Sequence, residues 1–202
     1  MALVVEKQAE APLNGIFQSS EGEELHKIAC QFTKDQYEER FACELSEFHP
    51  NTVSVYENNI LTAVAGFRGA ASGQLFLEQY LDTPIEDCIW AKFTPPAKRH
   101  EIVELGGFAA SSRHAAFPLM MYLAPALHKL GYTKLVCTAN KPIQICLKRL
   151  GLNPIFVADA DQTKLAASDE RWGTYYKGHP QIFTGDIKAG IQAMAKKAAL
   201  RR

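Results

Sequence analysis

The sequence lacks the features that mark a disulfide framework, a zinc site, a secreted protein or a membrane span. Its five cysteines include no CxxC pair, a pattern typical of reduced thiols in a reducing compartment. The longest apolar stretch, residues 115–127, contains two prolines and is shorter than the roughly 20 residues of a spanning helix. The amino-terminal residues have neither a basic lead nor the apolar core of a secretory signal. We therefore expect a soluble, cytoplasmic protein with no integral membrane segment.

The chain also lacks an excess of charge of either sign and a glycine-rich nucleotide motif. Lys and Arg together number 22, as do Asp and Glu, so bulk attraction to nucleic acid is not expected. Neither GxGxxG nor GxxxxGK[ST] occurs, which argues against a dinucleotide fold or a P-loop. A hydrophobic content of 47% in 202 residues suits a single domain, 1–202. We expect an amino-terminal strand and loop at 1–20 and a helical tail at 186–202.

Hydrophobic periodicity predicts alternating strands and helices. We expect a strand at 3–5, one bent or two successive helices over 23–48, a hairpin at 53–67, and a more helical stretch over 74–93; then a strand at 101–109, a helix at 114–130, a strand at 134–140, a helix at 142–151, a strand at 154–160, and a final helix. The hairpin turn is indicated by Asn58 and Asn59, because Asn tolerates positive φ. Hairpin and strand–helix–strand units together predict an α/β (α+β) fold, with a mixed central sheet flanked by helices.

The stretch EIVELGGFAASSRHAAF, residues 101–117, combines acidic, small and basic residues where a strand is followed by a helix. The free N–H groups of such a helix, with Arg113 beside them, suit an anionic ligand. An ordinary corner is the alternative, in which Ser111 or Ser112 caps the helix. A carboxylate in an apolar strand is a candidate general base for an amine, so Glu104 and, less favourably, Glu101 are candidate catalytic residues. On a regular strand the two glutamates face opposite sides, unless the glycines that follow form a bulge. The alternative for either glutamate is a surface acid paired with an arginine.

The order of elements, the turn after 101–109 and the phrase ICLKRLGLNPIFVA resemble the GNAT superfamily of N-acyltransferases. A closer resemblance is to the thermostable hemolysin family, which looks like a GNAT or acyl-homoserine-lactone-synthase type of domain. It is carried by LFLEQYLDTPIED (75–87), EIVELGGFAA (101–110), LHKLGYTKLVCTAN (127–140) and LKRLGLNP (147–154), and extends over about residues 25–185.

The resemblance implies a GNAT-like sheet and an acyl thioester donor, either acyl-CoA or an acyl-carrier protein, with a small amine as acceptor. No tightly bound cofactor or metal is implied. The implied donor-binding residues are Leu105, Gly106, Gly107, Phe108, Ala109, Ser112, Arg113, His114, Ala115, Ala116 and Asn140; the implied acceptor-binding residues are Glu78, Tyr80 and Asp82. For the last three, packing and loop capping are the alternative roles.

The sequence departs from the usual acetyltransferase pattern, since the turn that begins at Arg113 keeps an arginine but lacks the later glycines. This departure leaves a carrier-protein donor or a non-catalytic scaffold open beside acyl-CoA. The family name adds a third alternative, a protein that damages membranes directly, although the sequence shows no amphipathic stem. The aromatic run WGTYY at 172–176 is interpreted as core packing, with ligand stacking as the alternative.

Overall fold

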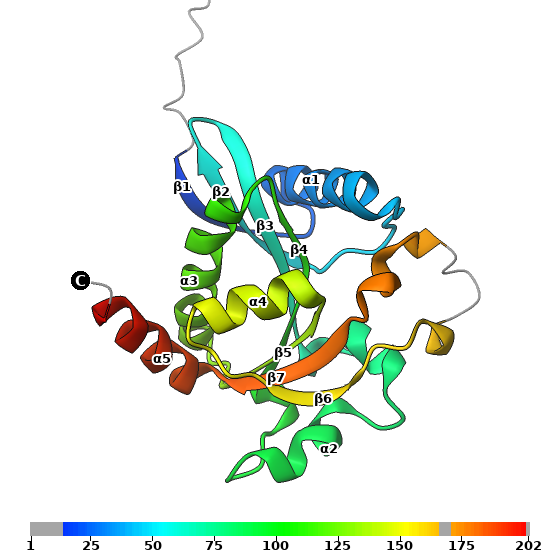
Figure 1. Cartoon of the computed structure of the whole chain (residues 1–202), viewed down its shortest axis with the longest axis vertical. Coiled ribbons are helices and arrows are strands. Elements are labelled where there is room, and N and C mark those ends of the chain that lie inside the picture. The colour runs from blue at the N-terminus through cyan, green and yellow to red at the C-terminus, as the bar shows by residue number, and fades with distance from the viewer. Residues whose placement is uncertain (1–13, 166–170, 201–202) are drawn as a thin grey trace, which may run out of the picture.

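The computed structural model describes residues 14–165 and 171–200, which fold around a seven-stranded sheet (Figure 1). The strand order is β1-β2-β3-β4-β5-β7-β6, in which β4 and β5 are parallel and every other neighbouring pair is antiparallel. The strands are β1 (Gly15–Ser20), β2 (Asn51–Glu57), β3 (Ile60–Gly69), β4 (Ile102–Ala110), β5 (Lys134–Ala139), β6 (Ile155–Asp159) and β7 (Gln181–Asp186). The helices are α1 (Glu24–Phe41), α2 (Ile85–Ile89), α3 (Arg113–Lys129), α4 (Lys141–Arg149) and α5 (Ile187–Ala199). The predicted mixed sheet with flanking helices is confirmed.

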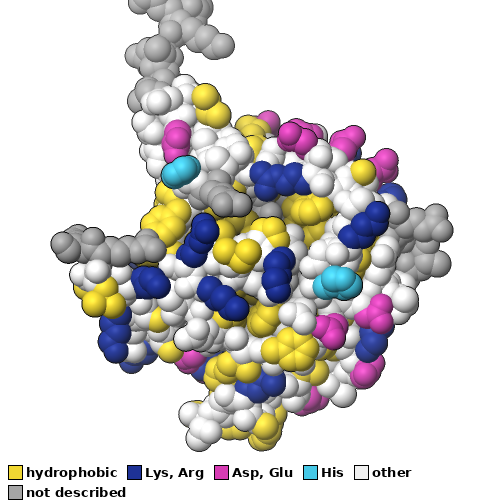
Figure 2. All heavy atoms as spheres, in the orientation of Figure 1, with side chains coloured by type: hydrophobic (Ala, Val, Ile, Leu, Met, Phe, Trp, Pro, Cys, Tyr) yellow, Lys and Arg dark blue, Asp and Glu magenta, His cyan; other side chains and the backbone are white. Residues whose placement is uncertain are grey.

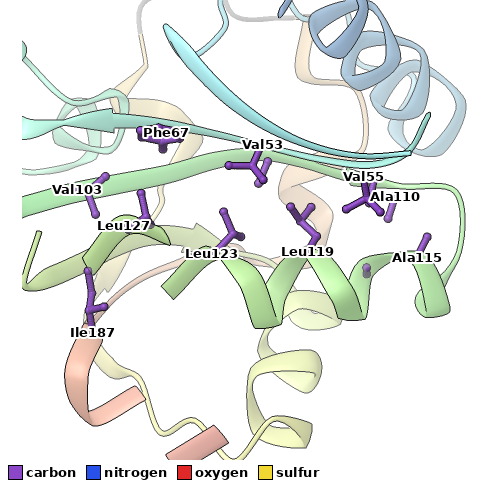
Figure 3. Close-up of a cluster of buried hydrophobic side chains, with 13 residues drawn as sticks. Val53, Val55, Phe67, Val103, Ala110, Ala115, Leu119, Leu123, Leu127 and Ile187 are labelled. Carbon is purple, nitrogen blue, oxygen red and sulfur yellow. The ribbon is translucent and has the colours of Figure 1, made fainter. Parts of the chain in front are cut away.

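One face of the sheet is covered by α3 and α5, which bury the main hydrophobic core (Figure 3). Leu119, Leu123 and Leu127 recur along α3 at the spacing of a helical face, and they pack against Val53 of β2 and Val103 of β4. A smaller hydrophobic cluster connects helix α4 to this layer. It consists of Leu150, which caps the end of α4, Met120 of α3 and Met194 of α5. The opposite face carries α1 and the segment between β3 and β4, which has a core of its own.

Two local predictions need correction. The expected loop before residue 20 is in fact the edge strand β1, which pairs with β2; the strand expected at 3–5 lies outside the described residues. The helix expected to reach residue 48 ends at Phe41, because Ala42 adopts a left-handed conformation with φ 52°. Residues 42–48 then run without helix or strand to His49. The predicted hairpin is confirmed, with φ of 51° and 67° at its two asparagines.

Strand β4 is irregular at the point where it leaves β5. The parallel ladder has four residue pairs and stops at Leu105 and Cys137, although both strands continue. On its other side, β4 stays paired with β3, but the register shifts between Val64 and Gly66. Gly107 lies at this shift with φ 54°, so it forms the bulge that the glycine pair suggested. The result is a gap between β4 and β5 at their carboxyl ends.

Candidate active site

A cavity of about 900 Å³ occupies the gap between β4 and β5. Its lining includes Tyr37 and His49 from the α1 face of the sheet, and Met120 and Ile143 from the α3 and α4 layer. The cavity therefore extends through the sheet instead of lying on one side of it. Its volume is at the upper end of the range for small-molecule and cofactor sites.

Most of the predicted donor-binding residues line this cavity. They are Leu105, Gly106, Gly107, Phe108, Ala109, Ser112, Ala116 and Asn140. Two do not: His114 is exposed on the first turn of α3, and Ala115 is buried in the main core. Arg113 is the first residue of α3, and its side chain is not among the described parts of the structure.

Helices α3, α4 and α5 begin at the cavity, and the side chain of the residue before each helix caps it: Ser112, Asn140 and Asp186. The Ser112 hydroxyl accepts a hydrogen bond from the Ala115 amide at 3.1 Å, and the Asn140 carbonyl oxygen accepts one from the Ile143 amide at 3.3 Å. The capping role proposed for Ser112 is therefore confirmed, and its contact with a phosphate stays a prediction. Each cap satisfies one amide, while the other first-turn amides of a helix lack intrahelical partners and favour anions.

Glu104 is buried on β4 and lines the cavity, with only 3% of its surface exposed. One carboxylate oxygen accepts the amide of Phe76 and the other that of Leu77, both at 2.8 Å. The side chain thus anchors the short helical turn Phe76–Tyr80 to the sheet. The role of Glu104 as a general base stays a prediction.

His49, which no sequence motif indicated as a site residue, also lines the cavity. Its ring lies over the paired residues Gly66 of β3 and Gly106 of β4; a β-carbon at Gly106 would come within 2.3 Å of the ring. The Nε2 atom lies 3.7 Å from the nearer oxygen of Glu104, and it is buried without a hydrogen-bond partner among the described residues. A buried polar atom left unpaired costs about 1–3 kcal/mol, so an exception of this kind calls for an explanation.

The backbone around His49 is also fixed. The buried His26 side chain of α1 contacts the His49 carbonyl through Nε2 at 2.9 Å. Since Pro50 follows immediately, the local backbone is further restricted. The ring is therefore held between α1 and the sheet, with 14% of its side chain exposed.

Glu101, the second candidate base, lies away from the large cavity. This residue ends a short 3₁₀ turn, Arg99–Glu101, one position before β4 begins, and its carboxylate accepts the Lys98 amide at 2.9 Å. It lines a smaller hollow of about 220 Å³ together with Lys134 and other residues, and it does not line the large cavity. Its role is that of a local cap.

The predicted acceptor residues separate into one that lines the cavity and two that do not. Tyr80 lines it and is 2% exposed. Asp82 is exposed and pairs with Lys164 at 2.7 Å. Glu78 is buried and accepts hydrogen bonds from the amides of Leu75 and Ile85 and from Arg99. For Glu78 and Asp82 the alternative, loop capping and packing, describes what the structure shows.

The environment of Glu78 favours its charged form. Burial acts against ionisation, but the Arg99 guanidinium and the two backbone amides outweigh it, so the pKa of Glu78 lies below its usual value of 4.5. Arg99 also bonds Glu86 at 2.6 Å, and the two carboxylates raise its pKa. This ion-pair network fixes the segment between β3 and β4, which carries the turn that Glu104 anchors.

Aromatic side chains form the part of the wall near α1. Trp172 and Tyr175 line the cavity and contact each other at a ring separation of 5.3 Å, and Tyr175 stacks on Tyr37. The core interpretation of the 172–176 run holds, and two of its rings also face the cavity. Burial raises the pKa of both Tyr37 and Tyr175. Burial, followed by the charge of Glu104, raises the pKa of the Cys137 thiol to about 12.

The fold defines a class. The mixed seven-stranded sheet flanked by helices is a GNAT-like fold, which it shares with a solved acyl-CoA N-acyltransferase from Pseudomonas aeruginosa. The sequence identifies the family within this fold. Residues 20–191 match the thermostable hemolysin family, and the chain belongs to that family.

Solved structures share the fold at low sequence identity. FeeM, an N-acyl amino acid synthase from uncultured soil microbes, superposes with a TM-score of 0.58 at 12% identity, covering 88% of this chain and 95% of its own. TofI, solved in a ternary complex with an inhibitor and MTA, gives 0.56 at 15% identity, over 88% and 96% of the two chains. The CoA-dependent acyl-homoserine lactone synthase MesI gives 0.53 at 16%, over 90% and 93%. No curated protein sequence matches the chain.

Over residues 14–165 and 171–200, no helix has the length and apolar character needed to cross a membrane. Within the same described ranges, His, Cys, Asp and Glu side chains form no group that could hold a metal ion.

Proposed function

We propose that this protein transfers an acyl group from a CoA or carrier-protein thioester to a small amine. The observation that carries the proposal is the cavity of about 900 Å³ that passes between β4 and β5. An acyl thioester is a long molecule with a polar end and an apolar end, and a cavity open through the sheet offers each end a different environment.

The backbone of β4 supports a donor site. Beyond Leu105, the strand no longer pairs with β5, and residues 106–110 line the cavity. The backbone edge of these residues is available to the amide groups of a pantetheine arm. Such an arm can hydrogen-bond to the strand in the way that a neighbouring strand does. The bulge at Gly107 redirects the backbone at this point, and backbone N–H groups there suit the polarised carbonyl of a thioester.

Charge on one face of the molecule supports an anionic donor. Figure 2 shows Lys and Arg side chains gathered around hydrophobic surface on the face where α4 lies toward the viewer. Helix α4 carries Lys141, Lys148 and Arg149, all exposed, and its first turn borders the cavity. These residues suit the phosphates of CoA or the acidic surface of a carrier protein. Two of the similar structures, FeeM and MesI, are named as enzymes that form N-acyl products or use CoA.

Direct transfer fits the chemistry of the site better than an acyl-enzyme intermediate. Cys137 lines the cavity, but a thiol with a pKa of about 12 remains protonated at neutral pH and is a poor nucleophile. In the proposed reaction the acceptor amine itself attacks the thioester carbonyl. The C–N bond forms, the C–S bond breaks, and the thiol leaves with a proton.

Calorimetric titration with free CoA, acetyl-CoA and octanoyl-CoA, followed by mass spectrometry of amides formed from a panel of amino acids and amines, tests this proposal. We expect octanoyl-CoA to bind, and Met120→Trp, which places a larger side chain in the apolar part of the cavity, to weaken octanoyl-CoA more than acetyl-CoA. Met121→Trp is the matched control, since Met121 is the next residue of α3 but does not line the cavity.

The outcomes separate the alternatives. Binding of an acyl-carrier protein but not of CoA thioesters would retain the acyl transfer and change the donor. A folded protein that binds and cleaves neither kind of thioester contradicts the proposal and leaves a non-catalytic scaffold. Leakage of lipid vesicles caused by the pure protein without any thioester would instead favour direct membrane damage.

A further inference from the structure

We propose that His49 takes the proton from the acceptor amine, and that the amine binds between His49 Nε2 and the Glu104 carboxylate. The inference rests on the proposed acyl transfer and names the catalytic group within it. Neither the family match nor the similar structures assign a role to this histidine.

The geometry provides a place for an amine. The two atoms are 3.7 Å apart, so one nitrogen can lie within hydrogen-bond distance of both. Nε2 has no hydrogen-bond partner among the described residues, so it is available to accept a proton. An amine reaches the enzyme as an ammonium ion at neutral pH, and a buried carboxylate next to an imidazole nitrogen without a partner among the described residues suits that ion.

Glu104 and His49 differ in the other hydrogen bonds that they make. Both oxygens of Glu104 already accept backbone amides, and the Phe76–Tyr80 turn depends on that contact. Within the described ranges, the Nε2 atom of His49 has no hydrogen-bond partner, although the backbone of this residue is fixed by His26. Glu104 is therefore suited to orient the ammonium ion and to stabilise the imidazolium that forms, and His49 is suited to carry the proton.

The glycine pair explains why the ring lies where it does. A β-carbon on Gly66 would lie 2.8 Å from the His49 Cβ, and one on Gly106 would lie 2.3 Å from Cε1. Only residues without side chains on both strands leave room for the imidazole beside Glu104. Since Gly106 also begins the part of β4 that leaves β5, the ring lies at the point where the thioester carbonyl is expected.

The proton balance is complete. The ammonium ion gives one proton to His49 and becomes a neutral amine, which attacks the thioester carbon. As the C–S bond breaks, the remaining extra proton on nitrogen goes to the departing sulfur. The products are an amide, a thiol and a protonated His49, which returns its proton to solvent.

Other titratable groups around His49 have to be separated from it in any pH measurement. They are Glu104 on β4, Cys137 on β5, His26 and Cys30 on α1, and Glu47 on the same segment as His49. Burial raises the pKa of Cys30 and, with Glu104, that of Cys137, so both thiols stay neutral where an imidazole titrates.

The test compares His49→Gln, His49→Ala and Glu104→Gln with His100→Gln, an exposed histidine that does not line the cavity. Octanoyl-CoA binding by calorimetry and thermal unfolding are measured first, so that a variant that fails to fold is recognised. Thioester cleavage with the best amine of the panel is then followed from about pH 5.5 to 9.5, a range that includes the titration of imidazole.

We expect His49→Gln to keep octanoyl-CoA binding and to lose about 100-fold or more in turnover, together with the fall in rate at acid pH. Free imidazole should partly restore the His49→Ala variant, because it fits the space over the two glycines. The His100→Gln profile should match the wild type.

Two results overturn the inference, and they differ from each other. In the first, the wild type turns over a thioester, and His49→Gln keeps both the rate and its fall at acid pH; another group then takes the proton. If Glu104→Gln loses that fall in rate, Glu104 is the group. If the wild type binds and cleaves no thioester, the proposed function itself fails, and the role of His49 fails with it.

Discussion

Glu78→Gln is predicted to destabilise the protein strongly, because it breaks a buried hydrogen-bond network without changing the shape of the side chain. The side chain of Glu78 is 6% exposed. One of its oxygens accepts from Leu75 N and from Arg99, and the other accepts from Ile85 N and from Arg99, at 2.7–3.0 Å. In Gln, one oxygen becomes an NH₂ group that faces two donors, so two of the four contacts are lost.

The size of the effect follows from that count. A hydrogen bond to a charged group contributes about 1.5–3 kcal/mol, and Arg99 is 30% exposed, which reduces its share through solvent screening. We expect a loss of about 3 kcal/mol in the free energy of unfolding. For a chain of this length this corresponds to a fall of about 6–12 °C in the melting temperature.

The effect should depend on pH with a definite sign. The folded-state pKa of Glu78 lies below its usual value of 4.5, so its contribution is fully present above that pH. It is lost as the pH falls through the lowered folded pKa. The difference in stability between wild type and Glu78→Gln should therefore be constant near neutrality and shrink below about pH 4.5.

Thermal and urea unfolding of both proteins across that pH range provides the assay. Glu86→Gln is the matched control, since Glu86 bonds the same arginine but makes one contact and is 26% exposed. A single, partly exposed ion pair of this kind contributes about 1 kcal/mol. Equal melting temperatures for the two variants would refute the reasoning, as would a difference that persists unchanged in acid.

The remaining predictions concern the cavity. Gly106→Ala should displace His49 and cost about 1–3 kcal/mol in urea unfolding, whereas Gly185→Ala, whose added carbon meets no atom within 4 Å, should change stability by less than about 1 kcal/mol. Equal costs would contradict the close contact. Cys137 should react slowly with iodoacetamide at pH 8, because a pKa of about 12 leaves about a thousand-fold less thiolate than the ordinary value of 9.0. Peptide mass spectrometry against Cys88, which does not line the cavity, measures this, and similar rates would refute it.

The sequence predicted those parts of the fold that depend on neighbouring residues. The hairpin at Asn58 and Asn59 and the helices closed by Gly131 and Gly151 occur where expected, since backbone conformation at these positions is limited by the residue itself. The edge strand β1 was missed because its pairing with β2, distant in sequence, makes it a strand.

The candidate site was predicted only along one strand. The run of small residues in β4 indicated a ligand, and Glu104 was indicated as a candidate base because its neighbours are apolar, with a surface ion pair as the alternative. The partners of these residues were not visible, since His49 approaches β4 only through the pairing of Gly66 with Gly106. Glu78 and Glu101 were misplaced for the same reason, because a carboxylate that caps a nearby turn has the same sequence pattern as one that faces a cavity.

The short ladder between β4 and β5 has a mechanical consequence. Among the described residues, four residue pairs between β4 and β5 join strands β1–β4 to strands β5–β7. The sheet therefore consists of two parts connected by one short parallel ladder. Both parts of the sheet line the cavity, so a molecule that fills it contacts both. Its binding energy then adds to the coupling between them. Amide hydrogens of β5 and β7 should exchange more slowly with a ligand present, even those far from the cavity.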